Sequence, residues 1–303
     1  MKDIFPKGAA WMDGEFIKLS EARIPILDWG FLRSDATYDV VHVWKKRFFL
    51  LDEHIDRFFK SIEKLRMPRQ IKKQELKVIL AGCVKNAGLE NAYVEMIQTR
   101  GMSANFERDP RKATPRLIVF AVPFGWILKP EDFEVGLDVF VTDIKRIPSD
   151  SVDPTIKNYH WLDLVSGMLK SYERGHDTAI LVDQNNNILE GPGFNIFIVD
   201  KNIMYTPDQG VLEGITRQTV IRLARELNLS INLKPISIQK LKSSDEIFAT
   251  STAGGIMPIT KIDGKLIGSG IPGKITRILH KIYWDKHFDL NWSLSLDDIL
   301  KKN

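Results

Sequence analysis

Residues 153–158 read DPTIKN and place Lys157 directly after an apolar isoleucine that follows a Pro-Thr turn. Three aromatic residues, at positions 159–161, come next, so the lysine lies in an aromatic neighbourhood at an element boundary. An amine that is partly removed from water loses proton affinity, and its neutral form can make an imine and carry protons. Lys157 is therefore a candidate catalytic group, with a solvated surface lysine as the alternative.

A second stretch, EGPGFN at residues 190–195, ends a predicted strand in a chain reversal. The glycines on either side of Pro192 allow close backbone approach, and we expect the Glu190 carboxylate to be exposed there. An acid in such a position can pair with a pyridinium nitrogen and strengthen that ring as an electron sink. A solvated turn glutamate is the alternative.

Two glycine-containing turns are candidate anion sites: LEGIT at residues 212–216 and STAGG at residues 251–255. The first opens a predicted helix, whose free N–H groups and positive dipole end suit a phosphate. The second supplies hydroxyl groups and a backbone that can form an anion nest. A helix cap and a loop between strands are the ordinary alternatives. Neither turn is followed by Gly-Lys-Ser/Thr, which disfavours nucleotide phosphoryl transfer.

Composition excludes several classes of protein. With 303 residues, 44% of them apolar and 27% charged, the chain is typical of globular proteins and long enough for two domains. The net charge of +4 lacks a long basic block, so no nucleic-acid partner is predicted. Cys83 is the only cysteine, which leaves no disulfide and no Cys-rich metal site, and we predict no metal. Without a signal core or a run of ~18 apolar residues, we expect a cytoplasmic protein and no membrane partner.

The pattern of apolar and turn residues predicts an α+β or α/β fold, not a doubly wound sheet. Hairpins are expected at 11–16 and 40–51, strands at 93–99 and 117–122 around a polar loop at 101–115, and helices at 52–65 and 74–85. The second part should hold strands at 178–183, 188–190, 195–199 and 203–206, and helices at 160–174, 215–227 and 272–284. We predict a small N-terminal domain at 1–122, a linker at 123–130 and a larger domain at 131–303.

Taken in order and spacing, these segments resemble the class IV aminotransferases, from about Gly8 to Tyr283. Within that family the (R)-selective amine:pyruvate transaminases are most similar, through ARIPILD (22–28), SDATYDV (34–40), DPTIKN (153–158), EGPGFN (190–195), GITR (214–217) and TAGGIMP (252–258). The resemblance implies fold type IV, with a smaller N-terminal α/β domain and a larger C-terminal pseudo-barrel domain. It also implies pyridoxal 5'-phosphate as the cofactor.

The resemblance assigns roles at the cofactor. Lys157 would hold it as a Schiff base and shuttle the proton, and Glu190 would pair with the pyridine nitrogen. The phosphate would be bound by Arg57, by the amides of Ile215 and Thr216, and by Thr252. Arg57 is expected to project opposite the apolar stripe of its helix. The remaining predicted cofactor-binding residues are Gly193, Phe194, Asn195 and Ser251.

The same resemblance implies a substrate pocket and a homodimer with the site near the interface. Arg108 would bind the carboxylate of pyruvate or alanine, with Arg111 or Arg116 as alternatives, because a guanidinium matches a carboxylate with two hydrogen bonds. Arg33 would reach the pocket across the dimer interface. The other predicted pocket residues are Tyr38, Val40, Tyr93, Trp161, Thr252 and Ala253.

The expected reaction is a ping-pong transamination between an (R)-amine or D-configured donor and pyruvate, so the predicted partners are small amines, amino acids and keto acids. A branched-chain or D-amino-acid aminotransferase is the main alternative. An aminodeoxychorismate-lyase-like enzyme is a further one, and a pyridoxal-phosphate carrier without activity is the non-enzymatic one.

Overall fold

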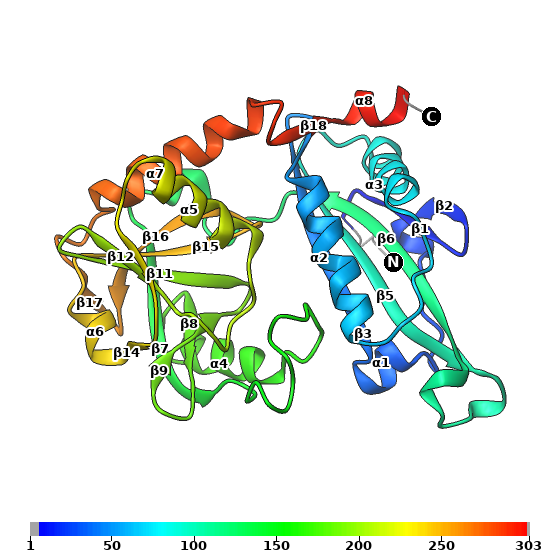
Figure 1. The fold of residues 1–303 in the computed structure, drawn as a ribbon, viewed down its shortest axis with the longest axis horizontal. Coiled ribbons are helices and arrows are strands. Elements are labelled where there is room, and N and C mark those ends of the chain that lie inside the picture. Colours follow the sequence, from blue (N-terminus) through cyan, green and yellow to red (C-terminus); the bar gives the residue numbers. More distant parts are fainter. Residues whose placement is uncertain (1–5, 302–303) are drawn as a thin grey trace. The chain divides into compact units, whose positions relative to one another are not determined.

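The computed structural model describes residues 6–301 and divides the chain into two compact units (Figure 1). The first unit contains the chain up to Gly125, the short segment Ile156–His160 and the segment from Lys286 onward. The second contains Trp126–Thr155 and Trp161–Asp285. Each unit mixes helices with a largely antiparallel sheet, as the sequence predicted.

The first unit is built on a seven-stranded sheet whose strands all pair antiparallel. Its order is β18 (Ser293–Ser295), β4 (Arg47–Phe49), β3 (Ala36–Trp44), β5 (Ala92–Ser103), β6 (Ala113–Pro123), β1 (Ala9–Met12) and β2 (Glu15–Lys18). The two predicted hairpins are confirmed as β1–β2 and β3–β4.

Helices α2 (Leu51–Lys64) and α3 (Lys73–Ala87) pack on the same face of this sheet (Figure 1). The predicted stripe on α2 lies in their shared core, where Ile55, Phe58 and Ile62 are buried against Val41 and Met96. Short elements complete the unit: η1 (Leu19–Glu21), α1 (Trp29–Arg33), η2 (Ala104–Phe106), η3 (Pro110–Lys112), η5 (Lys286–Phe288) and α8 (Leu296–Lys301).

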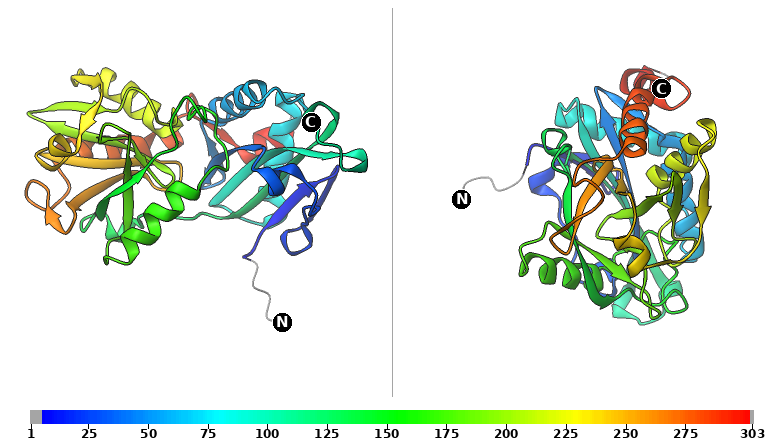
Figure 2. Two further views of the ribbon diagram at one scale, coloured as in Figure 1. Left: turned by 90° about the horizontal axis from the view of Figure 1, so that it is seen from below. Right: turned by 90° about the vertical axis from the view of Figure 1, so that its left-hand side faces the viewer.

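The second unit holds an eleven-stranded sheet. The main path runs β13 (Ile231–Leu233), β12 (Ile203–Thr206), β11 (Phe194–Asp200), β15 (Glu246–Ser251), β16 (Gly255–Ile262), β7 (Leu137–Lys145), β8 (Thr178–Val182), β9 (Asn187–Ile188) and β14 (Ile236–Ser237); β10 (Glu190–Gly191) pairs with β11 and β17 (Lys265–Leu266) with β16. Helix α4 (Leu162–Tyr172) packs against β7 and β8 (Figure 2). The other helices are η4 (Pro130–Asp132), α5 (Ile215–Glu226), α6 (Ile238–Lys242) and α7 (Lys274–Asp285).

The boundary between Gly125 and Trp126 lies within the predicted linker at 123–130. The prediction did not include the return of two later segments, Ile156–His160 and the segment from Lys286 onward, to the first unit. Strand β18 pairs with β4, so the C-terminal segment belongs to the first unit. Asn158 forms a bridge to Thr37 at the edge of β3, which draws Lys157 into the first unit as well. Such pairings join residues far apart in the sequence, and no local pattern reveals them.

The predicted polar loop at 101–115 is shorter in the structure, because β5 runs to Ser103 and β6 starts at Ala113. The register shifts between Thr99 and Met102, around Gly101, whose φ is +73°. A side chain at Gly101 would collide with the carbonyl oxygen of Thr114. The glycine therefore marks a bulge within the hairpin and not the end of a strand.

Within residues 6–301, no helix has the length and apolar character needed to cross a membrane. Nor do those residues contain a group of three or more histidine, cysteine or acidic side chains placed to hold a metal ion.

Candidate active site

Lys157 is fixed through its main chain at the edge of β3. Its carbonyl oxygen accepts hydrogen bonds from the Tyr38 amide (3.1 Å) and from the Thr37 hydroxyl (2.7 Å). Its own amide contacts the Ser61 hydroxyl on α2 at 3.4 Å. The side-chain amine lies 4.4 Å from the centre of the Tyr38 ring. The backbone of the lysine is thus held by two elements while its amine lies over an aromatic face.

A buried carboxylate, Glu95, lies among tyrosines on the same face of the sheet. The Tyr159 hydroxyl donates to Glu95 Oε1 at 2.6 Å, and Tyr159 stacks on Tyr38 with ring centres 4.4 Å apart. Tyr93 hydrogen-bonds to the same carboxyl group. Burial raises the pKa of Glu95, and the Tyr159 hydrogen bond and the Lys157 charge offset only part of that rise. Only 8% of Glu95 is exposed.

Sequence reasoning missed Glu95 and assigned no role to Tyr159. The sequence held a signal for Glu95: it lies two residues after Tyr93, a predicted pocket residue, and alternate residues of a strand share one face. The register of the sheet places Glu95 opposite Val40, another predicted pocket residue. Tyr159 gave no such signal, since its partner is 64 residues away.

Arg57 is anchored by Asp39, which faces α2 from β3. The guanidinium donates to Asp39 through Nε (2.7 Å to Oδ2) and Nη2 (2.9 Å to Oδ1), and His54 contacts Oδ1 at 2.8 Å. Burial alone would raise the pKa of Asp39, but the Arg57 charge and the His54 hydrogen bond hold it well below its usual range. The arginine side chain is 11% exposed. It therefore packs against the sheet, and the expectation that it projects opposite the apolar stripe was wrong because sequence alone did not show its acidic partner.

In the second unit, Glu190 is buried and fully engaged. Arg146 donates to its Oε1 through Nε (3.1 Å) and Nη2 (3.0 Å). Its Oε2 accepts from the Leu212 amide at 3.0 Å and from the Asn195 side chain at 3.5 Å. The expected exposure at the chain reversal was wrong, because these donors draw the side chain inward. The solvated turn glutamate is excluded with it.

Asn195 links this carboxylate to the turn at 212–216. Its side-chain amide also donates to the Leu212 carbonyl at 2.9 Å. A Cβ on Gly214 would collide with Asn195 Oδ1, so only glycine fits there. Gly214 offers no side-chain cap to α5, which starts at Ile215, and Thr216 is buried in the first turn. The first amides of this helix therefore remain suited to an anion.

The turn at 251–255 is equally constrained. The Ser251 hydroxyl donates to the Gly193 carbonyl at 2.8 Å and accepts from the Ala253 amide at 3.1 Å. Gly255 has a φ of +68°, and a Cβ there would lie 2.7 Å from the Tyr283 ring. The hydroxyl bonds fix the shape of the turn, and the bare backbone at Gly255 allows close approach of an anion.

The other predicted residues of the second unit differ in how far they are buried. Phe194 is buried in the hydrophobic core, so its place in the structure is that of a packing residue. Trp161 lies near Gly193, with Cη2 3.7 Å from the position of a Cβ there, and it packs against Leu164. Thr252 and Ala253 are partly exposed on the turn.

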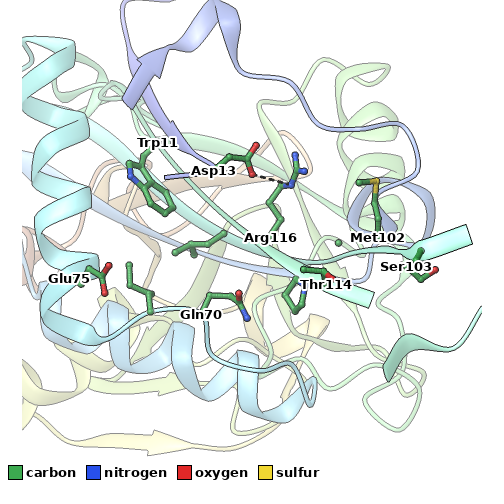
Figure 3. Close-up of a pocket in the computed structure, with 13 residues that line it drawn as sticks. Trp11, Asp13, Gln70, Glu75, Met102, Ser103, Thr114 and Arg116 are labelled. Atoms are coloured by element: carbon green, nitrogen blue, oxygen red, sulfur yellow. Dashed lines mark ion pairs between the residues drawn. The ribbon is translucent and has the colours of Figure 1, made fainter. Parts of the chain in front are cut away.

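The arginines proposed for substrate binding are not gathered together. Arg33 is exposed and its guanidinium lies 4.0 Å from the centre of the Trp29 ring. Arg108 is exposed between η2 and η3, where Arg111 pairs with Asp109. Arg116 lines a separate pocket of about 520 Å³ in the first unit, beside Asp13 and together with Trp11, Gln70 and Glu75 (Figure 3). Lys157 does not line that pocket.

Comparisons with known proteins show the family to which the chain belongs. Residues 36–262 match the family described as Amino-transferase class IV. A putative branched-chain-amino-acid aminotransferase of Methanocaldococcus jannaschii is 30% identical over 291 residues, which cover 95% of this chain and 99% of the relative. The D-alanine aminotransferase of Bacillus licheniformis is 30% identical over 269 residues, covering 88% and 92% of the two chains.

The fold has solved counterparts. The branched-chain amino acid aminotransferase of Thermobaculum terrenum, solved in its PLP-form, superposes with a TM-score of 0.86 at 25% identity and covers 96% of this chain and 98% of its own. The fold is therefore that of a two-domain fold type IV enzyme. With the family model spanning most of the sequence, this chain belongs to the class IV aminotransferases, transferases that use pyridoxal 5'-phosphate.

Proposed function

We propose that this enzyme transfers an amino group from an (R)-amine or D-configured donor to pyruvate in a ping-pong reaction. The observation that carries the proposal is the buried Glu95 carboxyl group, which shares a tyrosine cluster with Lys157. Membership of the family explains why the reaction is an amino transfer. Glu95 is the residue from which we infer the choice of donor and acceptor.

Pyridoxal 5'-phosphate has three groups that need partners, and the proposal assigns residues of this chain to each of them. Lys157 supplies an amine for the aldehyde, and Glu190 supplies a fixed carboxylate for the ring nitrogen. The phosphate suits the Ile215 and Thr216 amides, aided by Thr252 and Arg57. The fit is supported by the bare turns at 212–216 and 251–255, where side chains at Gly214 and Gly255 would collide with neighbours. When bound, the cofactor supplies the electron sink.

The protein supplies proton transfer and orientation. In this proposal the Lys157 Nζ would move a proton from the donor carbon to the cofactor in the first half-reaction, and from the cofactor to the acceptor carbon in the second. Hydrogen bonds from the Tyr38 amide and the Thr37 hydroxyl to the Lys157 carbonyl fix the start of the side chain, whose amine lies over the Tyr38 ring. Hydrogen bonds from Arg146 and from the Leu212 amide fix the orientation of the Glu190 carboxyl group.

Glu95 discriminates against a second carboxylate in the substrate. Two like charges about 5 Å apart at an effective dielectric of about 20 repel by roughly 3 kcal/mol, or about a hundredfold in rate or affinity. Donors such as simple amines and acceptors such as pyruvate avoid this repulsion, whereas 2-oxoglutarate meets it. Because the pKa of Glu95 is raised, the discrimination should weaken as the pH falls and the carboxyl group takes up a proton.

The test is a donor and acceptor panel with the wild type and Glu95→Gln. We expect (R)-1-phenylethylamine with pyruvate to give the highest kcat/KM, and Glu95→Gln to raise the relative rate with 2-oxoglutarate by ten- to a hundredfold. Lys157→Ala should be inactive in every pairing. Release of pyruvate without any amino acceptor would instead identify a lyase and refute the proposal.

The second candidate is a branched-chain or D-amino-acid aminotransferase, since relatives at 30% identity carry those descriptions. It predicts that L-leucine with 2-oxoglutarate, or D-alanine with 2-oxoglutarate, exceeds every pairing with pyruvate. That outcome would also show that Glu95 does not select the acceptor.

A homodimer is part of the same proposal. Residues 24–32 present a cluster of exposed apolar side chains directly before Arg33, namely Ile24, Ile26, Leu27, Phe31 and Leu32. A cluster of this kind usually marks an interface. Light scattering should give a dimer for the wild type and a monomer for the double variant Ile26→Ser/Phe31→Ser. We also propose a cytoplasmic location, since a buried free Cys83 has no disulfide to lose in a reducing compartment.

A further inference from the structure

Glu190 is one end of a buried row of three charges in the second unit. Arg146 contacts Glu190 Oε1 on one side and donates from Nη1 to Asp163 Oδ2 on the other, at 2.6 Å. The exposed fractions of the three side chains are 7% for Glu190, 14% for Arg146 and 9% for Asp163. Charges so shielded from water interact more strongly than surface pairs.

Asp163 is held rigidly at the far end of the row. Its Oδ2 also accepts from the Ile147 amide at 2.9 Å, and its Oδ1 accepts from the Leu164 amide at 2.8 Å in the first turn of α4. Burial would lower the pKa of Arg146, but the two carboxylates more than offset this and raise it. The guanidinium is therefore always charged.

The net charge of the row decides what Glu190 can attract. Glu190 and Arg146 alone would form a neutral pair with little net attraction for a cation. The second carboxylate leaves the row with one negative charge in excess. Arg146 contacts both acids. The negative charge of Asp163 therefore offsets part of the positive charge of Arg146, and Glu190 keeps more of its attraction for a cation.

We propose that Asp163 is a positioning residue that works through Arg146 to keep the Glu190 end of the row net negative, so that it favours a protonated ring nitrogen over a neutral ring. The inference rests on the proposed role of Glu190 and extends it to two residues with no assigned part. Asp163 itself touches neither substrate nor cofactor.

The test is Asp163→Asn, which removes the charge and keeps one of the two oxygen acceptors, the one for the Leu164 amide of the helix. Binding to the apoenzyme is measured for pyridoxal 5'-phosphate and for its carbocyclic analogue, in which C–H replaces the ring nitrogen. We expect affinity for the cofactor to fall about tenfold or more while affinity for the analogue is unchanged. The ¹⁵N chemical shift of the bound cofactor should move toward that of a neutral pyridine.

Asp263→Asn is the matched control. Asp263 also accepts a backbone hydrogen bond, from Val141, and pairs with a cation, Lys242, in the same unit. It should leave both affinities unchanged. A rescue variant adds Arg146→Met to Asp163→Asn, which again leaves one negative charge, on Glu190, and should restore the preference for the cofactor over the analogue.

Two results would overturn the inference: an equal loss for both ligands, which would indicate a structural role only, or no change for either. Glu190→Gln separates this failure from that of the proposed function. If Glu190→Gln abolishes the preference and Asp163→Asn does not, only the part given to Asp163 is lost. If Glu190→Gln itself has no effect, the pairing of Glu190 with the ring nitrogen is refuted.

Discussion

Replacing Asp39 with asparagine should uncouple Arg57 from the sheet and destabilise the first unit. In the wild type the carboxylate accepts two hydrogen bonds from Arg57, at 2.7 and 2.9 Å, and one from His54 at 2.8 Å. The substitution removes the carboxylate charge that is paired with a guanidinium whose side chain is 11% exposed. Breaking a buried pair from one side costs about 3–5 kcal/mol, and we expect the lower end because Arg57 can tilt toward water.

The assay is thermal unfolding of the apoenzyme together with cofactor affinity. A loss of about 3 kcal/mol corresponds to a drop of roughly 6 °C or more in Tm for a unit of this size. Affinity for pyridoxal 5'-phosphate should fall as well, since Arg57 loses its fixed position. Asp109→Asn, which removes an exposed partner of Arg111, should change neither quantity. A Tm within 1 °C of the wild type would refute the reasoning.

Three further outcomes follow from other buried groups. Gly255→Ala should lower the free energy of unfolding by about 2–4 kcal/mol and weaken cofactor binding, because the new Cβ meets the Tyr283 ring at a positive φ. Urea unfolding measures the first effect and titration of the apoenzyme with the cofactor measures the second. Unchanged values would contradict the prediction. Burial raises the pKa of Cys83 to about 12, so iodoacetamide at pH 8 should modify it only after unfolding, and rapid labelling of the folded protein would count against the structure. Burial lowers the pKa of His280 despite its hydrogen bond to the Ile256 carbonyl, so its contribution to stability is complete above the unfolded value of 6.5 and is lost as the pH falls below it. Tm measured from pH 7 to pH 5 should therefore fall less steeply in His280→Gln, and an unaltered slope would exclude this histidine as the cause.

Local periodicity was enough to predict most helices and hairpins. The stripe on α2 and the Asp13-Gly14 turn between β1 and β2 are properties of a few adjacent residues, and both appear in the structure. Strand β18 and the whole of β7 were missed. Each depends on a partner that is distant in sequence, namely β4 for the first and β8 and β16 for the second.

The candidate site divides in the same way. Motifs of a few residues identified Lys157, Glu190 and the two glycine turns, whose roles remain predictions. The buried ion-pair partners, Arg146 for Glu190 and Asp39 for Arg57, were not identified, because a single sequence does not show which charged residues pair in the core. Glu190 is an example: we expected an exposed carboxylate, but donors from three separate segments bind it in the interior.

The register of strand β3 matters because the two faces of the strand carry the partners of two different cations. Alternate residues of a strand face opposite sides, so Asp39 meets Arg57 under α2 while Tyr38 and Val40 face the side that carries Glu95. A slip of one residue would place the carboxylate beside Lys157 and leave Arg57 facing tyrosine, exchanging the surroundings of both cations. The bonds from Thr37 and Tyr38 to the Lys157 carbonyl tie the catalytic candidate to the same register. One strand thereby sets the electrostatic surroundings of the lysine and of the arginine together, and a change in pairing would disturb both at once.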